Sequence, residues 1–383
     1  MKKLIALLLA LVMVFSLVAC GAKEEAPAET PAEKPAETPA ETPAETPAEA
    51  PKDLSIVVSH QPYSHGLSSY IGEQEGTYAA AGLDMEILWF TGGNTQNEAL
   101  GADEWEAGCY GSPPSIAAGV AYNAHIIGVN VEDSVSIDYF VRPDSDIAQI
   151  SGAVEGYPEI LGNADTWRGK TILCATSTSV HFGLIATLAK MGLTQNDVNI
   201  VHMDVPSAYA AFKAGEGDVV SLWDPQSYQA EEEGWVRASY GEATGEPFPT
   251  VYVASEKAIE ENWDAVYTWF KTNIEINEAF EGDIEGQSKY LLQMQLENGI
   301  DTDESLAKRF CEDRPLSTLE KNIEYFKGEP GSRYMDEVMF NIVDFFVAQG
   351  SYSEADKETL KTNGWIDSQF IEALAAERGI EMK

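Results

Sequence analysis

The sequence predicts an α/β protein of two lobes, each built on a mostly parallel sheet, with a helical region toward the C-terminus. Three observations favour this fold class. Short apolar runs alternate with helical stretches between residues 54 and 254, a rhythm typical of βαβ units. The rhythm stops over a polar, glycine-rich stretch at 144–165 and then starts again. Residues 53–383 also exceed the ~250–300 residues that one hydrophobic core usually serves.

The first residues of the chain, 1–19, are interpreted as an export signal. Lys2 and Lys3 precede an apolar run at 4–18, which is too short and wrongly flanked for a membrane-spanning helix. The run ends in Leu17-Val18-Ala19-Cys20, and these four residues resemble a bacterial lipobox. We therefore expect cleavage before Cys20 and a lipid on Cys20 that holds the protein on the outer face of the cell membrane. An ordinary signal peptide with a chance cysteine is the alternative.

Residues 20–52 are interpreted as the lipidated cysteine followed by a tether. Tetrapeptides of the kind PAET recur from 27 to 50, and they carry too little apolar bulk to fold. Proline at every fourth position favours extended polyproline II, in which residues 21–52 would reach roughly 100 Å. The repeat could also be a ligand for another protein, but its composition suits a spacer that lifts a folded domain away from the membrane.

The formal net charge of −39 excludes one class of partner. A surface this acidic repels nucleic acid, so no nucleic acid is expected to bind. Between Leu54 and Trp167 the sole basic residue is Arg142. An anion bound by this half of the chain would therefore depend on backbone dipoles and hydroxyl groups instead of a cluster of lysine and arginine.

The spacing of cysteine and histidine predicts neither a metal site nor a cofactor. Three cysteines follow the lipobox, and an odd number leaves at least one thiol unpaired. These cysteines are Cys109, Cys174 and Cys311. The first two lie in apolar, strand-like runs and are interpreted as buried thiols. His60 and His65 lie five residues apart around a proline, and a metal site there is the weaker interpretation.

The first lobe is expected to comprise residues 53–142 and 250–383. Its strands are predicted at 54–58, 84–90, 107–110, 126–131 and 250–254, and its first helices at 66–74 and 112–120. Beyond Ser255 the pattern is helical. Aromatic residues such as Trp269 and Phe270 recur there at helical spacing, so we interpret them as core residues.

The second lobe is expected to be an insertion at 143–249. Its strands are predicted at 170–175, 198–203 and 218–223, and its helices at 180–191 and 207–214. Gly192 is placed to end the first of these helices. Asp224-Pro225 is typical of a cap followed by proline at the first helical position. In open parallel sheets the ligand-binding loops follow the C-terminal ends of the strands, so two facing lobes would form a cleft.

Three segments of the chain resemble solute-binding proteins of ABC importers. They are GTYAAAGLDMEI at 76–87, TWRGKTILCATSTSVHFGLIATLAKMGLTQNDVNIV at 166–201 and AYAAFKAGEGDVVSLWDP at 208–225. The likeness is strongest to the nitrate/sulfonate/taurine family and its thiamine-pyrimidine-binding relatives. It departs from the family pattern in GADEWEAGCYG, in TSTS where the family usually has a glycine-serine pair, and in a long stretch at 146–166 that could line or cover the cleft.

The resemblance implies a periplasmic-binding-protein fold of type II and a receptor outside the cytoplasm. It further implies a small-molecule ligand held between the lobes and an ABC transporter permease as partner. The ligand would be a sulfonate, taurine or nitrate, or a pyrimidine-like ring. No enzymatic activity and no cofactor are implied.

The stretch ATSTSVHFGL at 175–184 is the strongest candidate for a ligand site. Four hydroxyl residues, Thr176, Ser177, Thr178 and Ser179, lie between a predicted strand and a predicted helix. Unpaired N–H groups at a helix N-terminus together with hydroxyl donors form an anion site that needs no lysine or arginine. The plain alternative is that Ser177 or Ser179 caps the helix.

Other turns of the two lobes should face the same cleft. Three of these turns follow the first three predicted strands of the first lobe. Glycines in them permit close approach of the backbone. The remaining candidates come from the second lobe, where Asp224 could equally be a helix cap and His181 a buried residue with its own partner. The candidates are His60, Gln61, Tyr63, Thr91, Gly92, Gly93, Gly111, Ser112, His181, Trp223 and Asp224.

We expect, in sum, a lipid-anchored receptor that captures a small solute and passes it to a membrane permease. Two alternatives from other classes remain open. One is an enzyme on the same scaffold, with Cys174 and His181 as its reactive pair. The other is a surface lipoprotein that acts in adhesion or as a scaffold.

Overall fold

The computed structural model describes residues 54–382. The predicted signal at 1–19, the lipidated Cys20 and the tether at 20–52 lie outside these residues. Within the described part of the chain, no helix has the length and apolar character needed to cross a bilayer. All three described cysteines are buried and none forms a disulfide.

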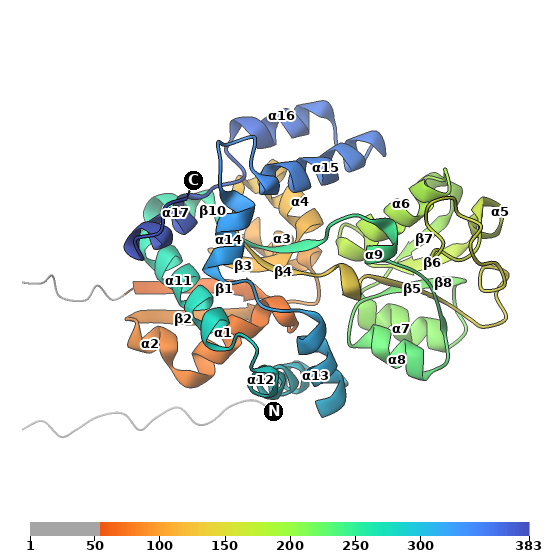
Figure 1. Ribbon diagram of the computed structural model, residues 1–383, viewed down its shortest axis with the longest axis horizontal. Helices are drawn as coiled ribbons and strands as arrows, with labels where there is room; N and C mark the ends of the chain where they lie inside the picture. The colour runs from red at the N-terminus through yellow and green to blue at the C-terminus, as the bar shows by residue number, and fades with distance from the viewer. Residues whose placement is uncertain (1–53, 383) are drawn as a thin grey trace, which may run out of the picture. The chain divides into compact units, whose positions relative to one another are not determined.

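The first five-stranded sheet, with the helices packed on it, is called lobe 1 below (Figure 1). Its strand order is β2 (Leu83–Trp89), β1 (Leu54–His60), β3 (Ala107–Gly111), β10 (Pro249–Ser255) and β4 (Ala124–Glu132). Strand β1 runs parallel to β2 and β3, whereas β10 runs antiparallel to β3 and β4. The helices that follow its first strands are α1 (Ser64–Glu75), α2 (Thr77–Ala80), α3 (Gly93–Leu100) and α4 (Ser112–Tyr122).

The second five-stranded sheet and its helices are called lobe 2. Its strand order is β7 (Asn199–His202), β6 (Thr171–Cys174), β8 (Val219–Leu222), β5 (Asp138–Val141) and β9 (Val236–Tyr240). Strand β6 is parallel to β7 and β8, and β5 is antiparallel to β8 and β9. Its helical segments are η1 (Ser134–Ser136), α5 (Ala164–Trp167), α6 (Ser179–Lys190), η2 (Gln195–Asp197), α7 (Val205–Lys213), α8 (Gln226–Glu232) and α9 (Gly241–Thr244).

The chain passes between the sheets twice, and this explains two departures from expectation. Both sheets are mixed, because strands β5 and β10 enter next to a crossing and run against their neighbours. Strand β5 belongs to the second sheet, so the first crossing lies at 133–137 instead of at residue 143. The second crossing lies at 241–248, between β9 and β10.

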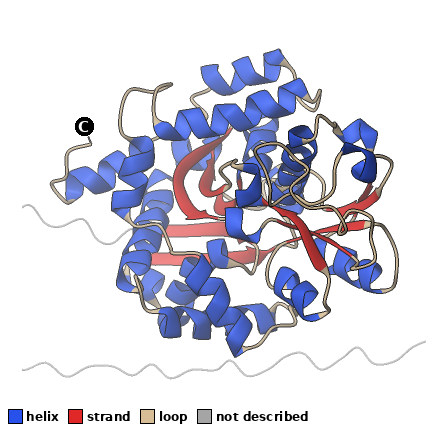
Figure 2. Cartoon of the chain, turned by 45° about the vertical axis from the view of Figure 1, so that its right-hand side comes forward, coloured by secondary structure: helices blue, strands red, loops and turns tan. Residues whose placement is uncertain are grey.

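The predicted helical C-terminal region is confirmed (Figure 2). Its helices are α10 (Glu256–Glu261), α11 (Trp263–Ala279), α12 (Ile284–Glu297), α13 (Glu304–Asp313), α14 (Leu319–Phe326), α15 (Tyr334–Ala348), α16 (Glu354–Thr362) and α17 (Gln369–Glu377). Trp269 and Phe270 of α11 are fully buried, as the helical spacing predicts. Asn322 of α14 fixes this region to lobe 1, because its side chain accepts from the N–H of Val129 at 2.8 Å and donates to the carbonyl of Val129 at 3.0 Å.

Two C-terminal helices also reach lobe 2. From α13, Arg309 pairs with Glu231 of α8 at 2.8 Å. From α15, the ring of Phe346 packs 5.7 Å from that of Phe182 on α6, and the end of α15 points toward α6 in Figure 1. The region therefore belongs to lobe 1 by its core but holds contacts with both lobes.

The long stretch at 146–166 does not line the space between the lobes. Leu161 donates its N–H to the carbonyl of Ala238 in β9 at 2.8 Å. Ile160 and Val154 form a small apolar cluster with Ala243 of α9. The stretch thus packs on the β9 and α9 side of lobe 2, and the expectation that it could line or cover the cleft is wrong for this structure.

Candidate functional site

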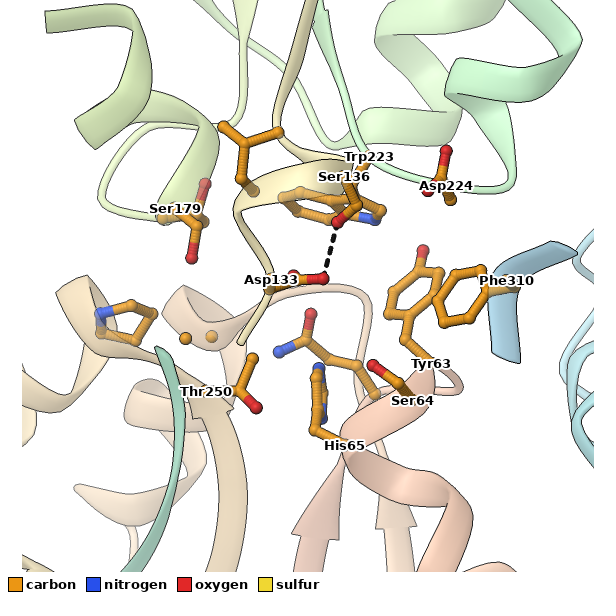
Figure 3. Close-up of a pocket in the computed structure, with 16 residues that line it drawn as sticks. Tyr63, Ser64, His65, Asp133, Ser136, Ser179, Trp223, Asp224, Thr250 and Phe310 are labelled. Carbon is orange, nitrogen blue, oxygen red and sulfur yellow. Dashed lines mark hydrogen bonds between the residues drawn. The ribbon is translucent and has the colours of Figure 1, made fainter. Parts of the chain in front are cut away.

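A cavity lies between the two lobes where their turns meet (Figure 3). The empty space between its walls measures about 460 Å³, counting the part that opens to solvent. Lobe 1 contributes the turns after β1 and β3, the start of α3 and the start of β10, and the first crossing adds residues between the lobes. Lobe 2 contributes the turns after β6 and β8, and helix α13 adds one phenyl ring.

Three long helices begin at this cavity, and none has a side-chain cap. Helix α1 starts after Tyr63, α4 after Gly111 and α6 after Thr178, and all three of these residues line the cavity. A helix N-terminus carries unpaired N–H groups and about half a positive charge, although Pro113 and Pro114 leave α4 with fewer N–H donors than α1 and α6. Uncapped helices that converge on one space therefore form a region where an anion is stabilised without a formal cation.

The lobes approach each other closely at Gly111. A Cβ added there would overlap the Oγ of Ser179, the first residue of α6. Glycine at this position allows the turn after β3 in lobe 1 to lie against the start of α6 in lobe 2. The two uncapped helix starts of α4 and α6 are therefore brought to the same wall of the cavity.

A buried cluster of one arginine and two aspartates closes the opposite wall. Arg314 is 1% exposed, and its Nε lies 2.7 Å from Asp133 Oδ1 while its Nη2 contacts Asp224 Oδ2. Ser136 donates to Asp133 at 2.7 Å, as the dashed line in Figure 3 shows. Tyr228 OH accepts from Arg314 Nη1 at 3.3 Å. The cluster joins the first crossing, lobe 2 and the C-terminal region.

Burial controls the charge of the groups in the cavity. It raises the pKa of Asp224 to about 7, although the guanidinium of Arg314 opposes the rise. Burial also lowers the pKa of His65 to about 3 and raises the pKa of Tyr63 to about 12. The imidazole and the phenol are therefore neutral near pH 7, and Asp224 is the group in this wall whose charge changes there.

Three buried polar atoms of the cavity have no hydrogen-bond partner among the described residues. They are Nδ1 of His65, Nε1 of Trp223 and Oδ1 of Asp224. An unpaired polar atom in a protein interior costs about 1–3 kcal/mol. A donor and an acceptor on adjacent residues, Trp223 and Asp224, are therefore left for a molecule that enters the cavity.

Eight of the residues predicted for the site line this cavity. They come from five turns, three in lobe 1 and two in lobe 2, that lie far apart in the sequence. They are Gln61, Tyr63, Gly93, Gly111, Thr178, Ser179, Trp223 and Asp224.

The run of four hydroxyls divides between the cavity and the surface. Thr178 and Ser179 line the cavity, and the Thr178 hydroxyl donates to the carbonyl of Ala175 at 2.6 Å. Thr176 turns outward to His202, with 2.8 Å between Oγ1 and Nδ1. Ser177 is exposed, with φ of 62°. The N-cap residue of α6 is Thr178, and its side chain makes no capping hydrogen bond. The interpretation of Ser177 or Ser179 as the cap is therefore wrong.

Other predicted residues support the cavity or lie beside it. His60 is buried beneath it, 2.8 Å from the hydroxyl of Ser69. Ser112 donates to the carbonyl of Pro249. Gly92 flanks the start of α3. Thr91 lines a neighbouring groove and not this cavity.

His181 and Asp224 resolve two of the open alternatives. His181 Nδ1 accepts from the N–H of Ser177 at 3.3 Å and its ring packs 6.4 Å from Phe346, so it is a buried residue with its own partner. Asp224 does not cap α8, which begins at Gln226 after Pro225. It pairs with Arg314 instead.

Sequence reasoning did not assign eight of the lining residues to the site. Ser64, His65 and Pro114 belong to turns whose other residues were predicted, and they could have been included with them. The other five come from the crossing, from the start of β10 and from α13, where the sequence pattern carries no signal of a ligand. The eight are Ser64, His65, Pro114, Asp133, Ser136, Ile137, Thr250 and Phe310.

Two α/β lobes with an interior cavity at their facing turns define a two-lobed solute-binding protein. No family model matches the chain. A protein of Brachyspira hyodysenteriae named as an ABC transporter periplasmic binding protein is 32% identical over 281 residues, which cover 73% of this chain and 78% of that protein. The taurine-binding periplasmic protein of Escherichia coli is 22% identical over 215 residues, or 55% of this chain and 62% of that protein.

Solved structures share the fold. The alkanesulfonate-binding protein SsuA from Xanthomonas axonopodis pv. citri, bound to MOPS, superposes with a TM-score of 0.62 at 20% identity, over 79% of this chain and 95% of that chain. The desulfurization enzyme DSZB superposes with a TM-score of 0.56 at 12% identity, over 85% of this chain and 99% of that chain. The fold is therefore that of the periplasmic binding proteins, as predicted. The same fold is also found in an enzyme, DSZB.

The chain belongs to the family of ABC transporter periplasmic binding proteins. It is accordingly an extracytoplasmic solute-binding protein of an ABC importer, with a small-molecule ligand and a transporter permease as partners.

Proposed function

We propose that the cavity captures a small sulfonated amine, a zwitterion of the taurine type. One observation carries this proposal: the uncapped starts of α1, α4 and α6 and the unpaired carboxylate oxygen of Asp224 share one cavity. The helix starts would hold the sulfonate. The carboxylate would accept from the ammonium group. The name of the taurine-binding relative supports the same ligand class.

The balance of charge in the cavity favours a zwitterion over a simple anion. Asp133 and Asp224 oppose the single guanidinium of Arg314, so with both carboxylates ionised the cluster has one negative charge in excess. Nitrate or an alkanesulfonate has no cationic group to meet that charge. An amine at the Asp224 end supplies it, together with N–H donors for the unpaired oxygen.

Calorimetric titration of the purified protein with four compounds tests this function. We expect taurine to bind at one site, ethanesulfonate and ethylamine to bind at least tenfold more weakly, and nitrate not to bind. Equal affinity for taurine and ethanesulfonate would show that no amine is recognised. Absence of binding by all four would remove the proposed ligand class.

Two serines of one turn provide the matched variants for this titration. Ser179→Ala removes a hydroxyl that lines the cavity, and Ser177→Ala removes one from the exposed face. We expect the first to lower taurine affinity about tenfold, because a hydrogen bond to a charged group contributes roughly 1.5–3 kcal/mol. The second should leave the affinity unchanged.

We infer that the protein binds its ligand without converting it. Cys174, the predicted nucleophile, is fully buried, and burial raises the pKa of its thiol to about 12. His181, its predicted base, is occupied by the N–H of Ser177. Taurine should therefore be recovered intact by mass spectrometry after long incubation with the protein. Loss of taurine that stops on Cys174→Ser would instead favour the enzyme.

We also infer that residues 1–19 are removed, that Cys20 carries a lipid and that 20–52 is the tether. The lipobox-like LVAC and the PAET repeats support this. Metabolic labelling with a radioactive fatty acid should mark the wild-type chain and not Cys20→Ser, and the variant should leave the membrane fraction. Retention of label by the variant would contradict the assignment. We propose as the domain limits a lobe 2 that runs from the first crossing at 133–137 to the second at 241–248, with the rest of the described residues in lobe 1.

A further inference from the structure

A second hollow lies in the C-terminal region and shares no lining residue with the cavity between the lobes. Its walls are the segment that leads into α15, one face of α15, α16 and the residues that follow α16. Helices α15 and α16 lie side by side at the top of Figure 1. The empty space between these walls measures about 1340 Å³, counting the part open to solvent. We call it the C-terminal hollow.

Arg333 lines the C-terminal hollow and is a buried cation without a counter-ion among the described residues. It is 5% exposed. Its Nη1 donates to the carbonyl of Ile366 at 3.0 Å, and its Nε has no hydrogen-bond partner in the described part of the chain. Arg314, the other described arginine that is buried, contacts two carboxylates. A charge taken out of water is destabilising unless an opposite charge compensates it, so Arg333 is suited to an anion that comes from outside.

The acidic residues around Arg333 do not pair with it. Asp336 is also buried, and its Oδ2 accepts two backbone N–H groups at the start of α15, at 2.9 and 3.0 Å. Glu337 lines the hollow from the exposed side of α15. Glu329 and Glu372 line a neighbouring hollow that Arg333 also borders. The guanidinium therefore keeps donors that no described carboxylate occupies.

A lysine and an aromatic ring lie on the same walls. Lys361 of α16 forms no ion pair with a described residue, and its Nζ lies 5.7 Å from the ring centre of Phe340. Lys357, one turn earlier, is already paired with Asp344. The ring of Phe340 is half-buried and packs 5.9 Å from Trp365. The hollow thus combines a free ammonium group with an accessible apolar ring.

This combination selects among the anions that an arginine binds. A guanidinium matches carboxylate and phosphate groups with two parallel hydrogen bonds. A phosphate monoester would bring a second negative charge next to Asp336 and Glu337, whereas a carboxylate brings one. An apolar group on the anion would find the ring of Phe340. The chemistry therefore favours a carboxylate that carries a ring.

We propose that the C-terminal hollow is a second ligand site, separate from the cavity between the lobes, that takes an aromatic monocarboxylate. Arg333 pairs with the carboxylate, Lys361 adds a second positive charge from the rim, and Phe340 packs against the ring of the ligand. The site does not depend on the solute that the cavity between the lobes captures.

Calorimetric titration of the purified protein with phenylacetate, acetate and 2-phenylethanol tests this site. We expect phenylacetate to bind with a stoichiometry of one. Acetate lacks the ring and 2-phenylethanol lacks the charge, so both should bind at least tenfold more weakly. Arg333→Gln should lower phenylacetate affinity about tenfold or more, because hydrogen bonds to a charged group are lost.

Two control variants locate the binding. Lys289→Gln removes a positive charge from the exposed surface of α12, outside the hollow. Ser179→Ala alters the cavity between the lobes. Both should leave phenylacetate affinity within twofold. Phenylacetate that binds Arg333→Gln as tightly as the wild type, that loses affinity in Ser179→Ala, or that does not bind the wild type would overturn the proposal.

Urea unfolding without ligand separates a binding role of Arg333 from a structural one. Arg333→Gln should keep the unfolding midpoint of the wild type or raise it, because the variant removes an uncompensated buried charge. A lower midpoint would show that the protein itself compensates this charge and would overturn the proposal. The same variant should bind taurine within twofold of the wild type, so failure of taurine to bind would leave this inference in place.

Discussion

At the scale of single residues, Arg314 makes the central contacts of one cavity wall, although nothing in the sequence predicted it as a site residue. Its guanidinium is fully buried and contacts the carboxylates of Asp133 and Asp224. Its carbon atom Cζ lies 4.1 Å from the ring centre of Phe310. A buried ion pair is weak evidence for stability, but removal of one partner leaves the other charges uncompensated. Arg314 therefore holds the carboxylates of Asp133 and Asp224 in place and supplies the counter-charge beside them.

Arg314→Met should lower the free energy of unfolding by about 3 kcal/mol at pH 7, because the buried carboxyl of Asp224 and the partly buried one of Asp133 lose their counter-charge. Urea unfolding without ligand measures the change. Arg309→Met is the matched control, since Arg309 is half-exposed on the same helix and pairs with Glu231. Exposed pairs contribute ~0–1 kcal/mol. Equal losses in the two variants would contradict a special role for the buried cluster.

The pH dependence of binding is set by Asp224. Because burial raises its pKa to about 7, the carboxyl is protonated below that pH and must lose its proton before it can accept an ammonium group. Taurine affinity should therefore fall as the pH drops below 7, by up to about tenfold per pH unit. Calorimetry between pH 5 and 8 measures it. Asp224→Asn should flatten the profile, and a profile unaffected by that substitution would place the titration elsewhere.

At the scale of elements, the sequence predicts long periodic segments and the parallel strands well, and the two antiparallel strands of lobe 2 poorly. The helix expected at 180–191 is α6 at Ser179–Lys190, and the strand expected at 84–90 is β2 at Leu83–Trp89. Strands β5 and β9 were not predicted. Strand β5 reads DYFV and is buried throughout, and β9 exposes Arg237 in VRASY. Neither carries the alternation that marks a strand, and their place depends on pairing with β8 and with each other.

The same contrast holds for the site. Turns after predicted strands could be placed at the cavity, because strands of one sheet end at one edge. Which hydroxyls of the run at 176–179 face inward could not be predicted, since it depends on the positive φ of Ser177. Phe310 and Thr250 could not be found either. They reach the cavity only through packing of distant segments.

The turn after β3 is the element at which lobe 1 lies against the start of α6 in lobe 2. Gly111→Val should lower taurine affinity at least tenfold, because its side chain would enter the space of Ser179. Thermal unfolding without ligand should change little, since Gly111 has φ of −64° and the backbone accepts a side chain there. Ala121→Val, on the exposed far end of α4, is the control. Unchanged affinity in Gly111→Val would show that the contact is not needed.

At the scale of the whole molecule, the C-terminal helices connect the lobes on two sides. Helix α13 reaches α8 through Arg309 and Glu231, and α15 reaches α6 through Phe346 and Phe182. Both contacted helices of lobe 2 begin close to turns that line the cavity. The relative position of the lobes is therefore set by this region as well as by the two crossings.

Phe346→Ala should loosen α6 from α15, because a buried ring is removed from the contact between lobes. We expect faster hydrogen exchange at amides of 179–190, measured by mass spectrometry without ligand. Phe340→Ala is the matched control on the same helix, where the ring packs 5.9 Å from Trp365 within lobe 1. Exchange in α6 that responds equally to both variants would assign the effect to α15 itself.

The distance along the chain between Arg314 and the turns that it supports has a consequence for biosynthesis. Ribosomes deliver Asp133 and Asp224 long before they deliver the guanidinium that neutralises them. A nascent chain that has completed both sheets still lacks one wall of its ligand chamber. We therefore expect a product that terminates before Arg314 to bind the solute more weakly than the finished receptor does.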